Sequence, residues 1–231
     1  MVDFVSFPPL SSATEDGLLA MGGELNLNTL VSAYSQGIFP WFNHDQPILW
    51  WSPDPRLILY PDEMKVSRSL RKVLRQNRFT VTCDRAFAEV IKGCAIRGSN
   101  KPFTPMPETW ITDDMHRAYV DLFEHGYAHS IEVWLGNRLV GGLYGVVLGK
   151  VFFGESMFSE VSNASKVAMA ALCNWLRQRD FAVIDCQVAS DHLFTLGARE
   201  IPRDDFMQYL QDVEIGQSSH HFGADFTCHF P

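Results

Sequence analysis

The stretch "HSIEVWLGNRLVGGLYGVVLGKVFFGESMF" (residues 129–158) decides the fold. Apolar and polar residues alternate along it, and the alternation is interrupted at Gly136-Asn137 and at Gly149-Lys150. Alternation with a period of two is typical of β-strands, and glycine beside a polar residue is typical of a tight turn. The stretch therefore predicts three antiparallel strands joined by hairpins.

The segments that follow complete one domain. Ser162 is expected to begin a helix, because apolar residues with helical spacing come after it: Met169, Leu172, Cys173 and Leu176. The apolar run "FAVIDCQV" (residues 181–188) predicts another strand, and a further helix is expected from Pro202. This order of elements predicts an α+β domain with a mixed, mostly antiparallel sheet.

A proline-rich segment separates this domain from a smaller N-terminal one. A short helix is expected from an Asn26 cap to Gly37. Prolines at positions 40, 47, 53, 55 and 61 lack N–H donors, so residues 39–61 predict irregular or edge-strand structure. We expect a small domain of residues 1–60 and a larger domain of residues 61–231. Beyond the boundary, the sequence predicts a basic helix, a strand in 78–83, a helix in 84–95, a loop in 96–108 and a helix after Thr112.

Composition bounds the class of protein. The chain has 231 residues, 46% of them apolar, and no run near the ~20 apolar residues of a membrane span. The first residues lack the basic start and apolar core of a signal peptide, so we expect a cytoplasmic protein with no membrane partner. Five cysteines without C-x-x-C spacing indicate free thiols rather than disulfides or zinc ligands. The tail carries His220, His221, Cys228 and His229, for which a loose terminus is favoured over a metal site, so we expect no metal.

One basic segment stands out against the net charge of −8. The segment "KVSRSLRKVLRQNR" (residues 65–78) holds six of the nineteen Lys and Arg residues and no acid. Four of its cations fall on one face of a helix capped by Ser67, with apolar residues on the other: Arg68, Arg71, Lys72 and Arg75. A solvated helix face is the alternative, but such faces usually mix charges of both signs. We therefore favour a polyanionic partner.

Tryptophans are concentrated in "GIFPWFNHDQPILWWSPDPR" (residues 37–56). Trp50 and Trp51 are adjacent, so in an extended segment they face opposite sides, and one of them can pack inward. Two interpretations stay open for these rings, a domain-interface core or a platform on which nucleic-acid bases stack. Trp110, in "ETWITDD", lies where a loop meets a helix, a position that a bound ligand explains more easily than a core does.

Many motifs in one order resemble a known family. They are "GLLAMGGEL", "AYSQGIFPWF", "PILWWSPDPR", "SRSLRK", "TWI", "AHSIEVW", "LVGGLYGV", "GESMFS", "NASK", "IDCQV" and "LGARE". Together, from about Phe7 to Leu210, they resemble the bacterial leucyl/phenylalanyl-tRNA–protein transferases. The loop of residues 96–108 is longer than expected of the family, and the tail after Glu214 matches none of its motifs.

The resemblance implies an aminoacyltransferase. Such an enzyme moves Leu or Phe, and less readily Met, from aminoacyl-tRNA to the α-amine of a protein beginning with Arg or Lys, which marks that protein for degradation under the N-end rule. It also implies a catalytic domain with the fold of GCN5-related acyltransferases, and Trp41 and Trp110 as the residues that bind the 3′-terminal adenosine. Trp50 and Trp51 are then structural. The basic helix, with Arg68, Arg71, Lys72 and Arg75, would bind tRNA.

Asp185 and Gln187 are the expected catalytic residues. They lie two positions apart on one strand, so they are expected to project to the same face and converge on one reacting centre. Asp185 suits holding the attacking amine or accepting its proton, and Gln187 suits positioning the amine or donating to the oxyanion. Both match the family's proposed catalytic positions. A buried capping aspartate and a core amide are the structural alternative.

An apolar pocket is expected nearby. The resemblance assigns the donor side chain to residues on neighbouring elements, any of which could also be plain core: Leu143, Phe152, Met157, Met169, Leu172, Leu176 and Ile184. It also assigns Glu155, in "GESMF", to this pocket, where its charge could attract the donor's ammonium group.

Two other classes remain to be separated from this one. An acyl-CoA N-acyltransferase would share the fold, but the chain lacks an R/Q-x-x-G-x-G/A pyrophosphate loop after a strand, so coenzyme A is not expected. An RNA-binding module would explain the tryptophans and the basic helix, but not Asp185, Gln187 and Glu155. We expect a monomer that uses no cofactor.

Overall fold

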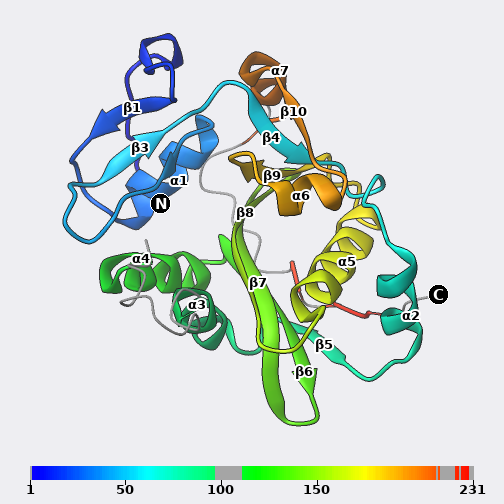
Figure 1. The fold of residues 1–231 in the computed structure, drawn as a ribbon. Coiled ribbons are helices and arrows are strands. Elements are labelled where there is room, and N and C mark those ends of the chain that lie inside the picture. Colours follow the sequence, from blue (N-terminus) through cyan, green and yellow to red (C-terminus); the bar gives the residue numbers. More distant parts are fainter. Residues whose placement is uncertain (1, 97–110, 212, 214–221, 224, 229–231) are drawn as a thin grey trace.

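The computed structural model describes residues 2–96, 111–211, 213, 222–223 and 225–228 (Figure 1). Its helices are α1 (Leu27–Ser35), α2 (Arg68–Arg75), α3 (Phe87–Ile96), α4 (Asp113–Glu124), α5 (Ala164–Arg177), α6 (Asp191–Thr195) and α7 (Arg203–Gln208). Its strands are β1 (Leu18–Met21), β2 (Phe39–Pro40), β3 (Leu49–Trp51), β4 (Arg56–Leu59), β5 (Thr80–Cys83), β6 (Ala128–Leu135), β7 (Arg138–Leu148), β8 (Val151–Ser159), β9 (Val183–Gln187) and β10 (Arg199–Ile201). Within these described ranges, every helix is too short or too polar to cross a bilayer.

The larger sheet has seven strands in the order β10-β4-β9-β8-β7-β6-β5. Its neighbours pair antiparallel, except β8 and β9, which run parallel. Parallel strands need a long crossover, and α5 supplies it. The three antiparallel strands predicted from residues 129–158 are confirmed as β6, β7 and β8. The sheet confirms the predicted α+β class with a mixed, mostly antiparallel sheet.

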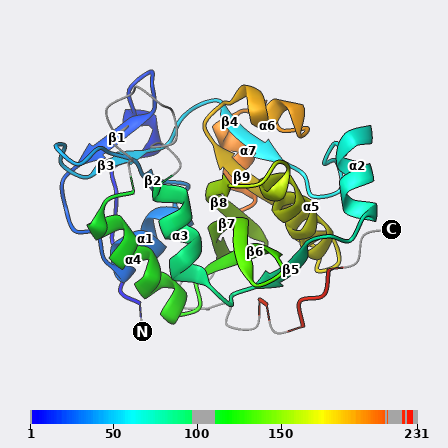
Figure 2. The same ribbon diagram turned by 60° about the horizontal axis from the view of Figure 1, so that its bottom comes forward.

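Helices cover both faces of this sheet. Figures 1 and 2 show α3 and α4 on one face and α5 on the other, with α2 beside α5. Side chains of neighbouring strand residues alternate between these two layers. Phe153 belongs to the apolar cluster that includes α3, α4 and the small domain, whereas Phe152 belongs to the cluster under α5. β6, β7 and β8 are therefore buried on both faces.

The small N-terminal domain contains β1, β3 and β2 in one sheet, with α1 beside it. Its link to α7 is specific, because Arg203 Nη1 donates to the carbonyl of Ser52 at 2.6 Å. Gly37 also lies close to α7, since a Cβ added at this position would be 2.5 Å from Met207 Sδ. A side chain at this position would displace Met207, and the left-handed φ of 72° at Gly37 also favours glycine.

β4 lies just before the expected domain boundary at residue 60. The prediction of irregular or edge structure for residues 39–61 is wrong for this strand, which lies inside the larger sheet between β10 and β9. Prolines 55 and 61 flank the strand but none falls within residues 56–59, so its N–H groups can pair on both sides. β4 therefore belongs to the larger sheet although it precedes residue 60.

Local capping signals position most helices correctly. The side chains of Asn26, Ser67 and Thr112 each accept a hydrogen bond from the first turn of α1, α2 and α4. The helix expected from Ser162 instead begins at Ala164, after Asn163. Asn163 has a left-handed φ of 71°, which asparagine tolerates better than most residues. The short elements α6 and β10 were not predicted, because five and three residues give no periodic pattern.

Candidate active site

A cavity lies where β8 and β9 diverge. The two strands pair from Val151 with Val183 to Phe153 with Asp185, and the pairing stops there. β8 continues beside β7 to Ser159, whereas β9 ends at Gln187. The cavity between the diverging ends measures about 210 Å³. Sites for drug-sized ligands measure ~300–1,000 Å³, so this one suits a group the size of a single side chain.

Gly145 shapes one wall of the cavity. A Cβ at this position would lie 2.2 Å from the Phe153 carbonyl oxygen and 2.5 Å from a ring carbon of Phe152. The register between β7 and β8 also shifts between Tyr144 and Gly145, which is a bulge that increases local twist. Glycine is therefore required for the close packing of Phe152, which lines the cavity.

Most of the expected apolar pocket residues meet at this cavity. The structure brings together six of them, from β7, β8, α5 and β9: Leu143, Phe152, Met157, Met169, Leu172 and Ile184. Leu176, one turn further along α5, is fully buried but does not line the cavity. The wall is apolar on this side, and the cavity is also lined by Ser190, His192 and Leu193.

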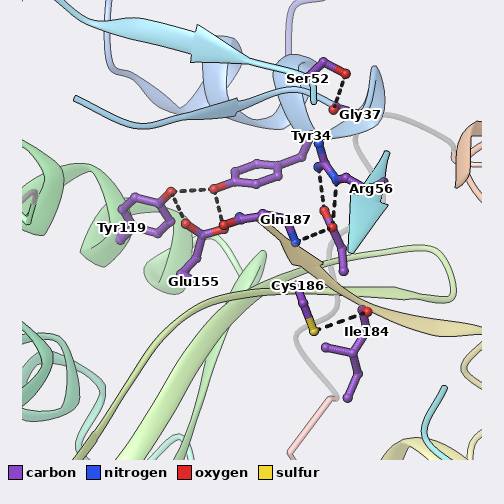
Figure 3. A network of polar contacts seen from close by, with 10 residues as sticks. Tyr34, Gly37, Ser52, Arg56, Tyr119, Glu155, Ile184, Cys186 and Gln187 are labelled. Carbon is purple, nitrogen blue, oxygen red and sulfur yellow. Dashed lines mark hydrogen bonds and ion pairs between the residues drawn. The ribbon is translucent and has the colours of Figure 1, made fainter. Parts of the chain in front are cut away.

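Glu155 accepts three hydrogen bonds at the polar end of the cavity (Figure 3). The Tyr34 hydroxyl and Gln187 Nε2 each donate to Oε1 at 2.8 Å. The Tyr119 hydroxyl donates to Oε2 at 2.8 Å, and the two tyrosine hydroxyls also bond to each other. Because Tyr34 belongs to α1, the small N-terminal domain contributes directly to this site.

The carboxyl of Glu155 has an unusually high pKa. Burial raises the pKa of Glu155 from its ordinary 4.5 to about 7, while hydrogen bonds from Tyr34 and Tyr119 lower it and the charge of Asp185 raises it further. Glu155 therefore changes its charge near neutral pH.

Asp185 lies behind this centre and not in the cavity. It is fully buried, and its Oδ1 and Oδ2 accept hydrogen bonds from Arg56 Nε at 2.8 Å and Nη2 at 2.6 Å. Oδ1 also accepts the backbone N–H of Gln187 at 2.9 Å. The expected convergence of Asp185 and Gln187 on one centre fails because strand alternation ends at Gln187, whose φ of 63° is left-handed. Gln187 lines the cavity and Asp185 does not.

The tryptophans of residues 37–56 occupy different environments. Trp50 is buried and donates its indole N–H to the Gly22 carbonyl at 2.9 Å. Trp51 is only partly buried, and its ring centroid lies 5.7 Å from that of Trp41. Trp41 is 43% exposed and does not line the cavity. Trp110 lies outside the described residues, so the expected adenosine site remains a prediction.

The basic segment does form a helix, with all four expected cations exposed: Arg68, Arg71, Lys72 and Arg75. Leu70 and Leu74 are buried on its other face. A second cavity of about 350 Å³ lies between α2 and α5, and Arg71 and Arg75 line it together with Arg177 of α5. The carboxylate of Asp62 also lines this cavity, so the three guanidinium groups leave an excess of positive charge. This excess suits an anionic partner, which stays a prediction.

Three residues of this site were missed in the sequence. Tyr34, Arg56 and Tyr119 are hydrogen-bonded to Glu155 or Asp185, yet they lie 121, 129 and 36 positions away from these acids. No spacing rule connects residues so far apart. Arg56 had one usable signal, since it follows three prolines and two tryptophans in "PILWWSPDPR" at the start of an apolar strand, where an arginine needs a buried partner.

The cavity combines an apolar wall with a titratable carboxyl, an arrangement that suits a small apolar group with a polar head. Two family models match the chain, "Leucyl/phenylalanyl-tRNA protein transferase" over residues 58–211 and its N-terminal domain over residues 23–54. The chain is thus an aminoacyltransferase. It belongs to the leucyl/phenylalanyl-tRNA–protein transferase family, which confirms the resemblance found in the motifs.

Curated relatives match over most of the chain. The leucyl/phenylalanyl-tRNA–protein transferase of Pseudomonas syringae pv. syringae (strain B728a) is 54% identical over 89% of this chain and 89% of its own length. That of Azoarcus sp. (strain BH72) is 54% identical over 91% of this chain and 88% of its own length. The two family models leave a gap between residues 54 and 58, so the model over residues 58–211 begins within β4.

The solved structures that match part of the chain are far more distant in sequence. One is an aminoglycoside acetyltransferase from an uncultured soil metagenomic sample in complex with sisomicin, with a TM-score of 0.38, 14% identity, and coverage of 68% of this chain and 96% of that one. Another is a GCN5-related N-acetyltransferase from Kribbella flavida, with a TM-score of 0.37, 11% identity, and coverage of 72% and 58%. The family assignment rests on the sequence matches and not on these structures.

Proposed function

We propose that this protein transfers Leu or Phe, and less readily Met, from aminoacyl-tRNA to the α-amine of proteins that begin with Arg or Lys. The product is marked for degradation, and the enzyme acts in the cytoplasm as a monomer without a cofactor. The observation that carries this proposal is the cavity at the divergence of β8 and β9, in a chain of this family. Its apolar wall suits a Leu or Phe side chain, and its polar end suits the reacting groups.

The chemistry needs orientation more than activation. An aminoacyl ester is already reactive, and a protein α-amine with a pKa near 8 is partly neutral at cellular pH. Holding the amine against the ester can supply roughly 7–11 kcal/mol of the barrier. Hydrogen bonds to the tetrahedral intermediate add to this. A covalent nucleophile is therefore not required.

Each polar group has a proposed role. Ionised Glu155 attracts the donor's ammonium group at the end of the apolar cavity. Gln187 Nε2 is held by Glu155, so the carbonyl end of the same amide, Oε1, is the end that can accept a hydrogen bond from the attacking amine. Asp185 acts from behind by holding Gln187, since its own oxygens are bonded to Arg56 and to the Gln187 N–H.

A transfer assay tests the proposal. The protein is mixed with Leu-tRNA or Phe-tRNA and a peptide that begins with Arg, and the peptide mass is followed. We expect an increase by one Leu or Phe residue, and no increase for a peptide that begins with Glu. An acetylated peptide with acetyl-CoA as donor would indicate an acyl-CoA transferase instead. Binding of tRNA without any extended peptide would indicate an RNA-binding module.

Trp41→Ala is expected to weaken donor use by about 1–3 kcal/mol, because one base–aromatic contact contributes that much. The loss should appear as a higher KM for Leu-tRNA, while the thermal midpoint changes little because Trp41 is an exposed side chain. Phe4→Ala is the matched control, since Phe4 is another exposed aromatic residue of the same domain. Equal KM values for wild type and Trp41→Ala would remove Trp41 from the adenosine site.

Replacing Arg71 and Lys72 together by alanine is expected to weaken Leu-tRNA and Phe-tRNA binding by similar factors. Each lost phosphate contact reduces counterion release, so the slope of log affinity against log salt should flatten by about 2 for the pair. Binding measured between 50 and 200 mM salt gives the slope. A double variant of Lys92 and Arg117, exposed cations of α3 and α4, removes the same charge from another face. A wild-type slope in the α2 variant would contradict tRNA docking on this helix.

A further inference from the structure

Arg56 is an unusual residue for the middle of a sheet. It lies on β4 with no exposed surface, and its guanidinium carbon is 4.8 Å from the Phe39 ring centroid and 4.9 Å from that of Phe206. These rings belong to β2 and α7, so Arg56 is enclosed where the small domain, the sheet and α7 meet. Its Nη1 is buried without a hydrogen-bond partner among the described residues.

Stability alone does not account for this pair. A buried ion pair gains little over apolar residues of similar volume, because removing both charges from water is costly. The unsatisfied Nη1 adds to that cost. The geometry is nevertheless specific, since the guanidinium makes two parallel bonds to Asp185 and fixes both of its oxygens.

The fixed carboxylate in turn holds Gln187. Asp185 Oδ1 accepts a hydrogen bond from the Gln187 N–H at 2.9 Å. The Gln187 backbone has a left-handed φ of 63°, which residues other than glycine rarely adopt. The register between β4 and β9 shifts at the same level, between Leu57 and Ile58. The Gln187 amide then reaches Glu155 at 2.8 Å. A continuous chain of contacts thus runs from Arg56 to the cavity (Figure 3).

We propose that Arg56 is a positioning residue for the transfer reaction, which acts through Asp185 to hold Gln187 in its left-handed conformation and aim its amide into the cavity. The inference rests on the proposed role of Gln187 in transfer. It gives β4 a function that no sequence motif assigns to it. Strain at Gln187 persists because Arg56 and Asp185 hold it from one side and Glu155 from the other.

The test separates positioning from folding by replacing both partners. In the double variant Arg56→Met with Asp185→Leu, no charge remains buried without a partner, so the protein is expected to fold. We expect its kcat with Leu-tRNA to fall at least ten-fold, with KM for the donor changed less than three-fold. Val133→Ala, a fully buried change on β6, serves as the control for destabilisation and should keep the wild-type kcat.

A cycle with Gln187→Ala tests the route of the effect. If Arg56 acts through Gln187, the double replacement should reduce kcat less than two-fold in the Gln187→Ala background. An equal ten-fold loss in both backgrounds would overturn the proposal, as would a wild-type kcat in the double variant. Should that variant not fold, Arg56→Lys takes its place in the same cycle, because lysine keeps the charge but not the paired bonds. Failure of the wild-type protein to extend any peptide would instead refute the proposed function.

Discussion

Asp185→Ala is expected to lower the free energy of unfolding by about 3–5 kcal/mol, because it leaves the Arg56 guanidinium buried without its counter-charge. Whole domains are stable by only ~5–15 kcal/mol, so this one change removes a large fraction of the total. Chemical denaturation followed by circular dichroism measures it. The same experiment on Glu160→Ala gives the comparison, since Glu160 pairs with Arg138 at the surface at 2.6 Å.

The two ion pairs should differ sharply. Exposed pairs contribute about 0–1 kcal/mol, so Glu160→Ala should unfold close to wild type. The double variant Arg56→Met with Asp185→Leu should recover most of the stability lost in Asp185→Ala, because no unpaired charge is left inside. If Asp185→Ala unfolded at the wild-type denaturant concentration, the Arg56–Asp185 pair would not be buried as described.

Glu155→Gln is expected to raise the donor KM about 10- to 100-fold at pH 8, since a hydrogen bond to a charged group contributes roughly 1.5–3 kcal/mol. Glutamine keeps the shape and the tyrosine contacts but removes the charge that attracts the donor's ammonium. Wild-type KM should itself rise as pH falls through about 7, the pKa of Glu155, because the carboxyl then becomes neutral. The Gln variant should lack this rise.

Stability should respond to pH in the opposite direction. The folded protein holds a proton on Glu155 up to a pH of about 7, whereas the unfolded chain releases it near 4.5. The folded state therefore binds more protons between these values, and wild-type stability falls as pH rises through that window. Glu155→Gln should remove this slope, and Glu160→Gln, an exposed control, should not.

An unchanged donor KM in Glu155→Gln would contradict the proposed contact between Glu155 and the donor's ammonium group.

The hydrogen-bond network around Glu155 explains why this one carboxyl can change both the donor KM and the stability with pH. Burial makes the charged form of Glu155 costly, and hydrogen bonds from Tyr34 and Tyr119 offset part of that cost. Burial and the Glu155 charge also raise the pKa values of both tyrosines well above the ordinary 10, so the tyrosines stay protonated while Glu155 titrates. The site therefore keeps its geometry while only Glu155 changes its charge.

Fold prediction succeeded where the signal is local. The hairpins of residues 129–158 are marked by alternation and by glycine turns, and α2 and α4 are marked by the capping residues Ser67 and Thr112. It failed at β4, where flanking prolines suggested an edge although the strand itself contains none. The helix expected from Ser162 begins two residues later, at Ala164, because Asn163 before it adopts a left-handed conformation.

The sequence by itself determined the family, the α+β class and the basic helix, because these follow from motifs and from short spacings along the chain. The resemblance to the family also implied seven apolar pocket residues, six of which line the cavity. Only the tertiary structure decided which polar residues line the cavity and which lie behind it. It gave Glu155 two tyrosines from α1 and α4, and it placed Asp185 against Arg56 and out of the cavity. The physical reason is distance along the chain. Hydrogen bonds between residues 36 to 129 positions apart depend on how the small domain packs and where β8 leaves β9, and no local pattern encodes either.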